Sequence, residues 1–179
     1  MPVVDLSPQE LMSYSGMNPK PKDFDAYWER ALSDMRAVDA KVDMQPAAFQ
    51  APFADCLDLT FTGVGGARVY AKYLRPKGDA TPHPAVLVFH GYTGDSGDWV
   101  RLLPYAAAGF SVAALDCRGQ GGRSEDVGGV VGNTMRGQII RGLDNPDADH
   151  LLFRSIFLDC AQLAGIVMDQ PEVDASRVG

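Results

Sequence analysis

Basic residues are scarce in this sequence. In 179 residues, 16 lysines and arginines stand against 23 aspartates and glutamates, which gives a formal net charge of −7. The basic residues are scattered and form no run that could follow a phosphate backbone. Nucleic acid is therefore not an expected partner.

Long apolar runs are also lacking. No stretch approaches the roughly 20 apolar residues that span a bilayer, and residues 1–6 (MPVVDL) have neither the basic start nor the apolar core of a secretory signal. We expect a cytoplasmic protein with no membrane partner.

Cysteine is rare as well. Cys56, Cys117 and Cys160 are odd in number, widely spaced and set in apolar segments, which indicates reduced packing residues rather than bridges or metal ligands. Residues 63–68 (GVGGAR) lack the third glycine of a dinucleotide fingerprint, and no phosphate-binding loop ending in Gly-Lys-Ser/Thr occurs. We expect no metal and no cofactor.

What the sequence does contain is the pattern of a globular unit, with 46% hydrophobic and 22% charged residues. The apolar spacing predicts a helix over 23–35, capped by Asp23. Alternating segments at 56–62 and 68–74, joined by the glycines of 63–66, predict an antiparallel hairpin.

The second half predicts a parallel βαβ arrangement. Residues 85–89 (AVLVF) and 110–115 are continuously apolar, as in strands that are covered on both faces. A helix over 99–108, closed by Gly109, separates them. A helix follows from Asp149, as its cap, to about residue 168, with Leu152, Ile156, Leu163 and Val167 along its buried side. A third strand over 175–179 continues the pattern.

Two segments stand where ligands bind in such sheets, beyond the carboxyl ends of the strands. A Gly-rich connection over 119–142 without periodicity is expected to border a site. His90-Gly91-Tyr92 follows the first parallel strand, where α/β-hydrolases place one N–H of the oxyanion hole. The Tyr92 amide is our candidate donor, and its ring could wall the acyl pocket.

A structural interpretation of the same residues stays open. Gly91 would then be needed for backbone conformation alone, and His90 would be satisfied by neighbouring carbonyls. His90 is expected to be structural in either case, because the catalytic histidine of this fold follows the nucleophile. His83 and His150 adjoin turns or caps and are expected at the surface.

The nucleophile is missing from these residues. No Gly-x-Ser-x-Gly occurs, and residues 94–98 (GDSGD) fail at the fifth position. Three strands in order place the expected nucleophile elbow immediately after Gly179. We therefore expect residues 1–179 to be the N-terminal portion of one partial α/β-hydrolase domain, with the nucleophile, acid and histidine beyond it.

The sequence resembles the acetyl xylan esterase and cephalosporin C deacetylase family of carbohydrate esterases over nearly its whole length. The motifs that carry this resemblance are DFDAYW at 23–28, LTFTG at 59–63, HGY at 90–92, RGQ at 118–120, SED at 124–126 and PEVD at 171–174.

The resemblance implies a metal-independent serine esterase that removes acetyl groups from short xylo-oligosaccharides and related small esters. It implies a homo-oligomer, often a hexamer, with the remainder of the polypeptide and a small acetylated substrate as partners. Tyr92 and Gly91 would contact the oxyanion or substrate. Arg118 and Gln120 would support them, Arg118 through a fork of hydrogen bonds to carboxylate or carbonyl groups.

Asp116 and Asp159 are expected to anchor loops or caps rather than to serve as the catalytic acid. Two other functions remain open. One is a non-catalytic fragment or interaction module, although an unpaired apolar strand edge argues against it. The other is a different hydrolase of the same fold, such as a peptidase or dienelactone hydrolase.

Overall fold

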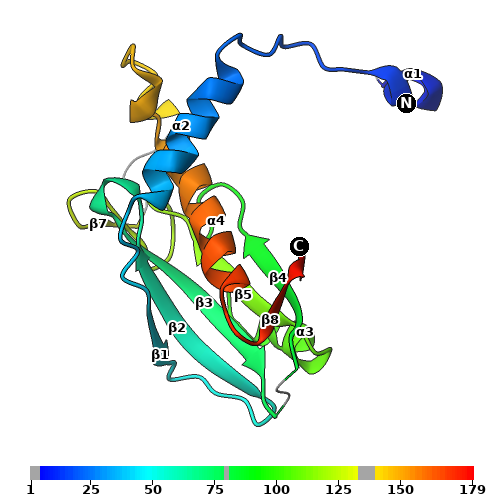
Figure 1. Cartoon of the computed structure of the whole chain (residues 1–179), viewed down its shortest axis with the longest axis vertical. Coiled ribbons are helices and arrows are strands. Elements are labelled where there is room, and N and C mark those ends of the chain that lie inside the picture. Colours follow the sequence, from blue (N-terminus) through cyan, green and yellow to red (C-terminus); the bar gives the residue numbers. More distant parts are fainter. Residues whose placement is uncertain (1–4, 79–80, 133–139) are drawn as a thin grey trace.

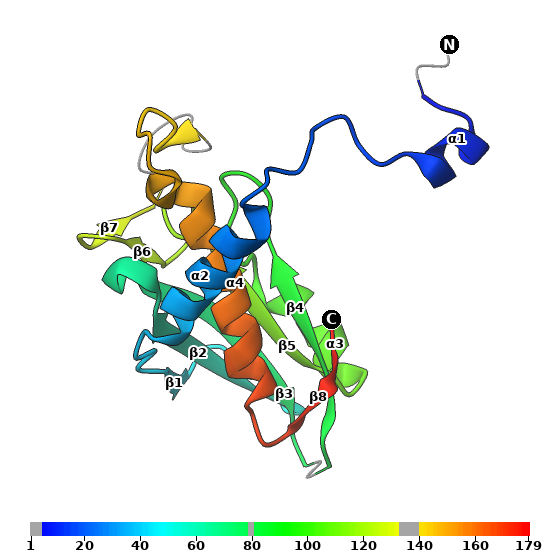
Figure 2. The same cartoon turned by 45° about the horizontal axis from the view of Figure 1, so that its top comes forward.

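The computed structural model describes residues 5–78, 81–132 and 140–179. Its centre is a six-stranded mixed sheet with helices on both faces, and an N-terminal arm that carries a short helix projects away from this body (Figures 1 and 2). None of the residues in that short helix is buried.

The sheet has the order β1-β2-β3-β5-β4-β8. Strands β1, β2, β3 and β5 pair antiparallel in succession, whereas β5, β4 and β8 run parallel. A separate two-stranded hairpin pairs β6 with β7. The strands are β1 (Asp43–Pro46), β2 (Ala54–Thr62), β3 (Arg68–Pro76), β4 (His83–Phe89), β5 (Ser111–Asp116), β6 (Glu125–Asp126), β7 (Val130–Val131) and β8 (Val173–Val178).

The described helices are short apart from α2 and α4. They are α1 (Pro8–Ser13), α2 (Phe24–Arg36), α3 (Leu103–Ala107) and α4 (Leu152–Met168), with 3₁₀ turns η1 (Val64–Gly66), η2 (Trp99–Arg101) and η4 (Ala148–His150). Helix α4 packs on one sheet face through Ile156 and Leu163, and α3 covers the other through Ala106, together with Leu102 directly before it. Helix α2 lies outside α4, against Leu158.

The β2–β3 hairpin confirms the prediction from apolar alternation, and the parallel strands β4 and β5 confirm the prediction from continuous apolar runs. Gly65 and Gly66 take positive φ values of 71° and 84° in the turn between β2 and β3, as the glycine-rich linker indicated. Every residue of β5 is buried, as expected for a strand between two helical layers. Strand β8 begins two residues earlier than predicted and pairs parallel with β4.

The prediction of one helix over 99–108 was wrong in part. The segment forms the 3₁₀ turn η2 and then the five-residue helix α3. Pro104 accounts for the break, because proline has no N–H to continue a helical ladder and fits only the first turn of a helix. Gly109 ends the segment with a φ of 88°, as predicted.

The two predicted helix caps also need correction. Asp23 occupies the residue before α2 but makes no capping hydrogen bond. Asp149 lies in η4, and α4 begins at Leu152. The Asp149 carboxylate accepts hydrogen bonds from Arg30 instead, at 2.7 and 3.2 Å. It therefore ties η4 to α2 across the molecule rather than capping a helix.

His83 is not a surface residue, contrary to the prediction. It is the first residue of β4 and is 7% exposed, with its Nε2 2.9 Å from the Ser111 hydroxyl. This pair lies at the amino ends of β4 and β5, opposite to the edge where sites form in parallel sheets. His150 is exposed, as predicted.

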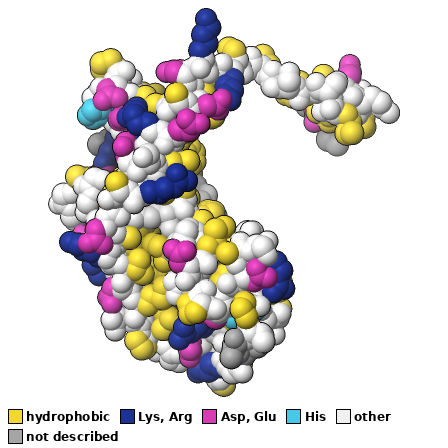
Figure 3. Space-filling model, viewed as in Figure 1, with side chains coloured by type: hydrophobic (Ala, Val, Ile, Leu, Met, Phe, Trp, Pro, Cys, Tyr) yellow, Lys and Arg dark blue, Asp and Glu magenta, His cyan; other side chains and the backbone are white. Residues whose placement is uncertain are grey.

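The connection over 119–142 has more structure than its sequence indicated, because it holds the β6–β7 hairpin. Residues 133–139 of that connection lie outside the described residues. Figure 3 shows acidic and basic side chains interspersed over the visible face, with no large field of one sign. No helix in the described part of the chain has both the length and the apolar character needed to cross a membrane.

Candidate active site

The chain makes a tight turn directly after β4. The Gly94 amide donates to the Gly91 carbonyl at 3.0 Å, so Tyr92 and Thr93 are the central residues of a four-residue turn. Thr93 has a φ of 62°, in the left-handed region that β-branched residues rarely adopt. Tyr92 thus lies in a turn and not in a helix, and its side chain is 52% exposed.

Hydrogen bonds from the segment after β5 hold this turn. The Gln120 side-chain oxygen accepts from the Thr93 amide at 2.8 Å. The His90 ring accepts at Nε2 from the Cys117 amide at 2.9 Å, and its Nδ1 lies 2.7 Å from the Gly91 carbonyl. Because Nε2 is an acceptor, Nδ1 carries the proton and donates to that carbonyl. His90 is therefore satisfied by backbone groups, and the structural interpretation was right in part: one partner is the expected carbonyl, whereas the other is the Cys117 amide.

Asp116, at the end of β5, makes a second connection between the loop after β4 and the loop after β5. This carboxylate is 1% exposed and accepts from the Ser96 amide at 2.6 Å and from the Arg123 amide at 2.7 Å. Gly122, with a φ of 90°, makes the approach possible, because a Cβ there would collide with the carboxylate. Asp116 thus anchors loops, as predicted.

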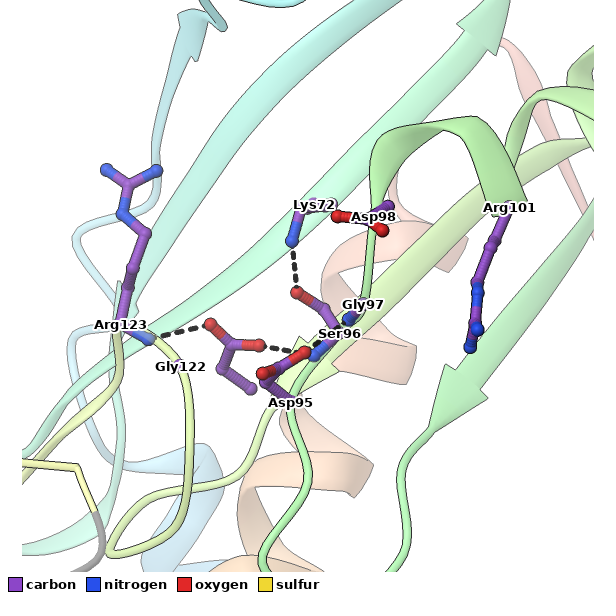
Figure 4. Close-up of a pocket in the computed structure, with 9 residues that line it drawn as sticks. Lys72, Asp95, Ser96, Gly97, Asp98, Arg101, Gly122 and Arg123 are labelled. Atoms are coloured by element: carbon purple, nitrogen blue, oxygen red, sulfur yellow. Dashed lines mark hydrogen bonds between the residues drawn. The ribbon is translucent and has the colours of Figure 1, made fainter.

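Asp116 also lines a hollow of about 470 Å³. In this hollow, the Lys72 ammonium donates to the Ser96 hydroxyl at 2.6 Å (Figure 4). Arg101 and Arg123 line the same hollow together with Asp95 and Asp98. Its charges of both signs are balanced, so it offers no net attraction for an ion of either sign.

Arg118 makes the fork of hydrogen bonds that the sequence predicted. It is 1% exposed, and its Nε and Nη2 donate to the Asp159 carboxylate at 2.7 and 2.6 Å, while Nη1 donates to the Val64 carbonyl at 2.9 Å. Burial raises the pKa of Asp159 to about 6, and the Arg118 guanidinium opposes that rise. Arg118 therefore joins the loop after β5 to α4 and η1.

The structure brings four of the five predicted site residues to one cavity of about 310 Å³. The lining residues are Phe89, His90, Gly91, Tyr92, Cys117, Gln120, Phe153, Ile156, Phe157 and Cys160. Arg118 is the exception, because its side chain lines a different hollow, beside η1. The cavity therefore combines an apolar wall with one polar turn, as small-molecule sites do.

Sequence reasoning missed part of this cavity. It assigned the buried side of α4 to Leu152, Ile156, Leu163 and Val167, all of which are buried or nearly so. It did not assign Phe153 and Phe157, which are four residues apart and so share a helix face. That spacing was the available signal. No group of three His, Cys, Asp or Glu side chains in the described ranges could hold a metal ion.

Comparisons with known proteins give consistent matches. The family model described as acetyl xylan esterase (AXE1) matches residues 1–179. The crystal structure of acetyl xylan esterase 1 from Thermoanaerobacterium sp. JW/SL YS485 is 60% identical, with a TM-score of 0.89 over 98% of this chain and 55% of its own. The acetyl xylan esterase from Paenibacillus sp. R4 is 28% identical, with a TM-score of 0.79 over 97% of this chain and 55% of its own.

A curated relative carries a different name. The dihydrolipoyllysine-residue acetyltransferase component of the acetoin cleaving system from Cupriavidus necator is 31% identical over 154 residues, which are 82% of this chain and 38% of that protein. The chain thus spans little more than half the length of the solved relatives, and less of this one. The mixed sheet and these matches show a partial α/β-hydrolase fold, as the sequence predicted.

Proposed function

Because this chain belongs to the acetyl xylan esterase family, we propose that the protein carrying it is a serine carboxylesterase that removes acetyl groups from acetylated xylo-oligosaccharides and from related small esters such as cephalosporin C. The chain supplies one donor of the oxyanion hole, and the serine, acid and histidine come from residues beyond 179. The proposal rests on the turn at 91–94, which the Gln120 side chain holds by a hydrogen bond and which lies beside an apolar cavity.

The turn suits this role for an electrostatic reason. When serine attacks an ester, the carbonyl oxygen gains negative charge, and a preorganised N–H there stabilises the transition state more than the ground state. Gln120, His90 and Asp116 all hold the turn or its flanks by hydrogen bonds, so the Tyr92 N–H needs no reorganisation during the reaction. Four aromatic side chains line the cavity, and an apolar lining strengthens the interaction because it lowers the local dielectric constant.

The names of the relatives favour an acetyl group as the acyl part. The two solved esterases are named for acetyl xylan, and the curated relative is named an acetyltransferase component. A cavity of about 310 Å³ with an apolar wall suits a small acyl group better than a peptide. The oligomer, which the resemblance gives as often a hexamer, belongs to the same proposal.

Tyr92→Pro tests the backbone donor directly. Tyr92 is the first central residue of its turn and has no positive φ, and proline is favoured at that position while lacking the N–H. In the full-length protein we expect kcat on an acetyl ester to fall by about 10²–10³, as for loss of one oxyanion donor.

Tyr92→Phe keeps the N–H and is the matched control, with kcat expected to stay within about threefold, less than the effect of one hydrogen bond. Equal rates for Tyr92→Pro and the parent protein, with both folded, would rule out the amide as donor. Rates on acetylated xylo-oligosaccharides, longer acyl esters and peptides would distinguish the proposed esterase from a peptidase or another hydrolase.

A further inference from the structure

Two thiols share the cavity beside the turn. Cys117 directly follows β5 and is 3% exposed, whereas Cys160 lies in α4 and is partly exposed. Both line the 310 Å³ cavity together with His90. They are 43 residues apart in sequence, and the packing of α4 on β5 brings them together.

The two thiols are not equivalent chemically. Both thiols line one cavity, where the neighbouring Cys160 thiol lowers the pKa of Cys117, while Cys117 raises the pKa of Cys160. Cys117 is thus favoured as the thiolate and Cys160 as the thiol, which is the arrangement of an attacking and a resolving cysteine.

Cys56 provides an internal contrast. It is also buried, but it belongs to the core on the α3 side of the sheet, and burial raises its pKa. It lines neither this cavity nor the hollow beside Asp116. Cys56 is therefore the expected inert packing thiol, and it serves as a matched control within the same chain.

We propose that Cys117 and Cys160 form a modification site at which a peroxide converts the two thiols into one disulfide. The Cys117 thiolate attacks one oxygen of hydrogen peroxide, the O–O bond breaks, and hydroxide leaves, so that sulfur is oxidised to the sulfenic acid. The Cys160 sulfur then attacks the Cys117 sulfur, and the sulfenic oxygen leaves as water. In sum, two thiols and one peroxide give one disulfide and two waters.

Oxidation of this cysteine pair affects the turn at 91–94 through His90. The Cys117 amide donates to His90 Nε2, and His90 donates to the Gly91 carbonyl. Drawing Cys117 toward α4 therefore disturbs the turn that holds Tyr92. This consequence, a reversible loss of esterase activity, rests on the proposed function, whereas disulfide formation does not.

Peptide mapping of the full-length protein tests the disulfide. The reduced protein is treated with hydrogen peroxide, blocked with a thiol alkylating reagent and cut with trypsin without reductant. We expect a linked pair of peptides, Leu102–Arg118 and Ser155–Arg177, two hydrogens lighter than their sum and separated by dithiothreitol. Overoxidation of Cys117 without that linked pair would overturn the proposal.

Three variants sharpen the test. In Cys160→Ser, peroxide should leave Cys117 as a sulfenic acid, which dimedone labels. Cys117→Ser should show neither dimedone labelling at this site nor the disulfide-linked peptide pair. Cys56→Ser should give the linked pair as the parent does. A link that forms equally well to Cys56, or a Cys56 thiol oxidised as fast as Cys117, would contradict the assignment. If peroxide forms the link in a protein that lacks esterase activity, only the proposed function fails.

Discussion

At the scale of single residues, side-chain oxygens that accept from backbone amides decide the shape of the turn beside the cavity. Thr93 stays in the left-handed region because its amide has a fixed acceptor in Gln120, which is 3% exposed. Backbone strain of this kind, about 1–2 kcal/mol, persists only where the surroundings hold it. Gln120 is therefore a positioning residue for the turn.

Gln120→Met keeps the side-chain volume but removes the acceptor, so the Thr93 amide loses its partner at a cost of about 1–3 kcal/mol. If the turn relaxes, we expect kcat on acetyl esters to fall by about tenfold, equivalent to about 1.4 kcal/mol, with KM nearly unchanged. Steady-state kinetics measures both. Gln170→Met, which removes a hydrogen bond to the Ile166 carbonyl, is the control that should leave kcat unchanged. A rise in KM alone would assign Gln120 to ground-state binding.

Asp174 gives a prediction about pH at the same scale. Hydrogen bonds from Ser176 and then from Arg177 lower the pKa of this carboxyl to about 2. Its contribution to stability is therefore present above the unfolded pKa of about 3.9 and is lost as the pH falls through about 2. An NMR titration of the Asp174 carboxyl carbon should show this midpoint. Ser176→Ala should raise it, and an unchanged midpoint in that variant would refute the stated cause.

At the scale of elements, a buried ion pair connects the segment after β5 to α4. Arg118 and Asp159 are almost fully buried, and the third guanidinium nitrogen bonds to η1. Gly63 leaves the room for this contact, because a Cβ there would overlap both the carboxylate and the guanidinium. The pair therefore fixes three elements relative to one another beneath the loop that carries Gln120.

Asp159→Asn would leave the buried Arg118 charge with only its longer contact to the Asp126 carboxylate, at 3.9 Å. Breaking a buried pair from one side costs about 3–5 kcal/mol, because the remaining charge stays desolvated. Urea unfolding of the full-length variant should show a loss of that size in the free energy of unfolding. Asp34→Asn removes only long contacts of an exposed carboxylate, with Arg30 at 4.0 Å and Arg154 at 3.7 Å, and should cost less than about 1 kcal/mol. Equal losses for the two variants would show that burial of the pair does not matter.

At the scale of the whole molecule, the sheet lies between two unequal helical layers. Helix α4, with α2 outside it, covers one face, and the shorter α3 covers the other. Strand β5 is central, with β3 on one side and β4 on the other. It is also buried throughout, so its amides have no access to water without opening the sheet.

This arrangement predicts the pattern of amide hydrogen exchange. The amides of β5 should exchange last, with free energies of opening close to that of global unfolding, because each pairs with a neighbour inside the core. The amides of β1, which pairs with β2 alone, should exchange much sooner. Exchange followed by NMR or mass spectrometry measures this order. Faster exchange in β5 than in β1 would contradict the described sheet order.

The amino-acid sequence by itself determined much of this protein, through local pattern and through resemblance. Apolar alternation predicted the β2–β3 hairpin, continuous apolar runs predicted β4 and β5, and helical spacing predicted α4, because the apolar pattern of each element reflects the faces that it buries. The motif at 90–92 placed a turn after the first parallel strand, and the fork at Arg118 followed from the chemistry of its side chain. The family and the α/β-hydrolase fold were also within reach of the sequence.

Tertiary structure alone decided what depends on distant residues. The burial of His83 follows from Ser111, 28 residues away, and the role of Asp149 from Arg30, 119 residues away. Local sequence does not reveal such partners, because they meet only when the sheet and its helices assemble. The same holds for Cys117 and Cys160: each reads as a packing thiol by itself, and only the contact of α4 with the end of β5 makes them a pair.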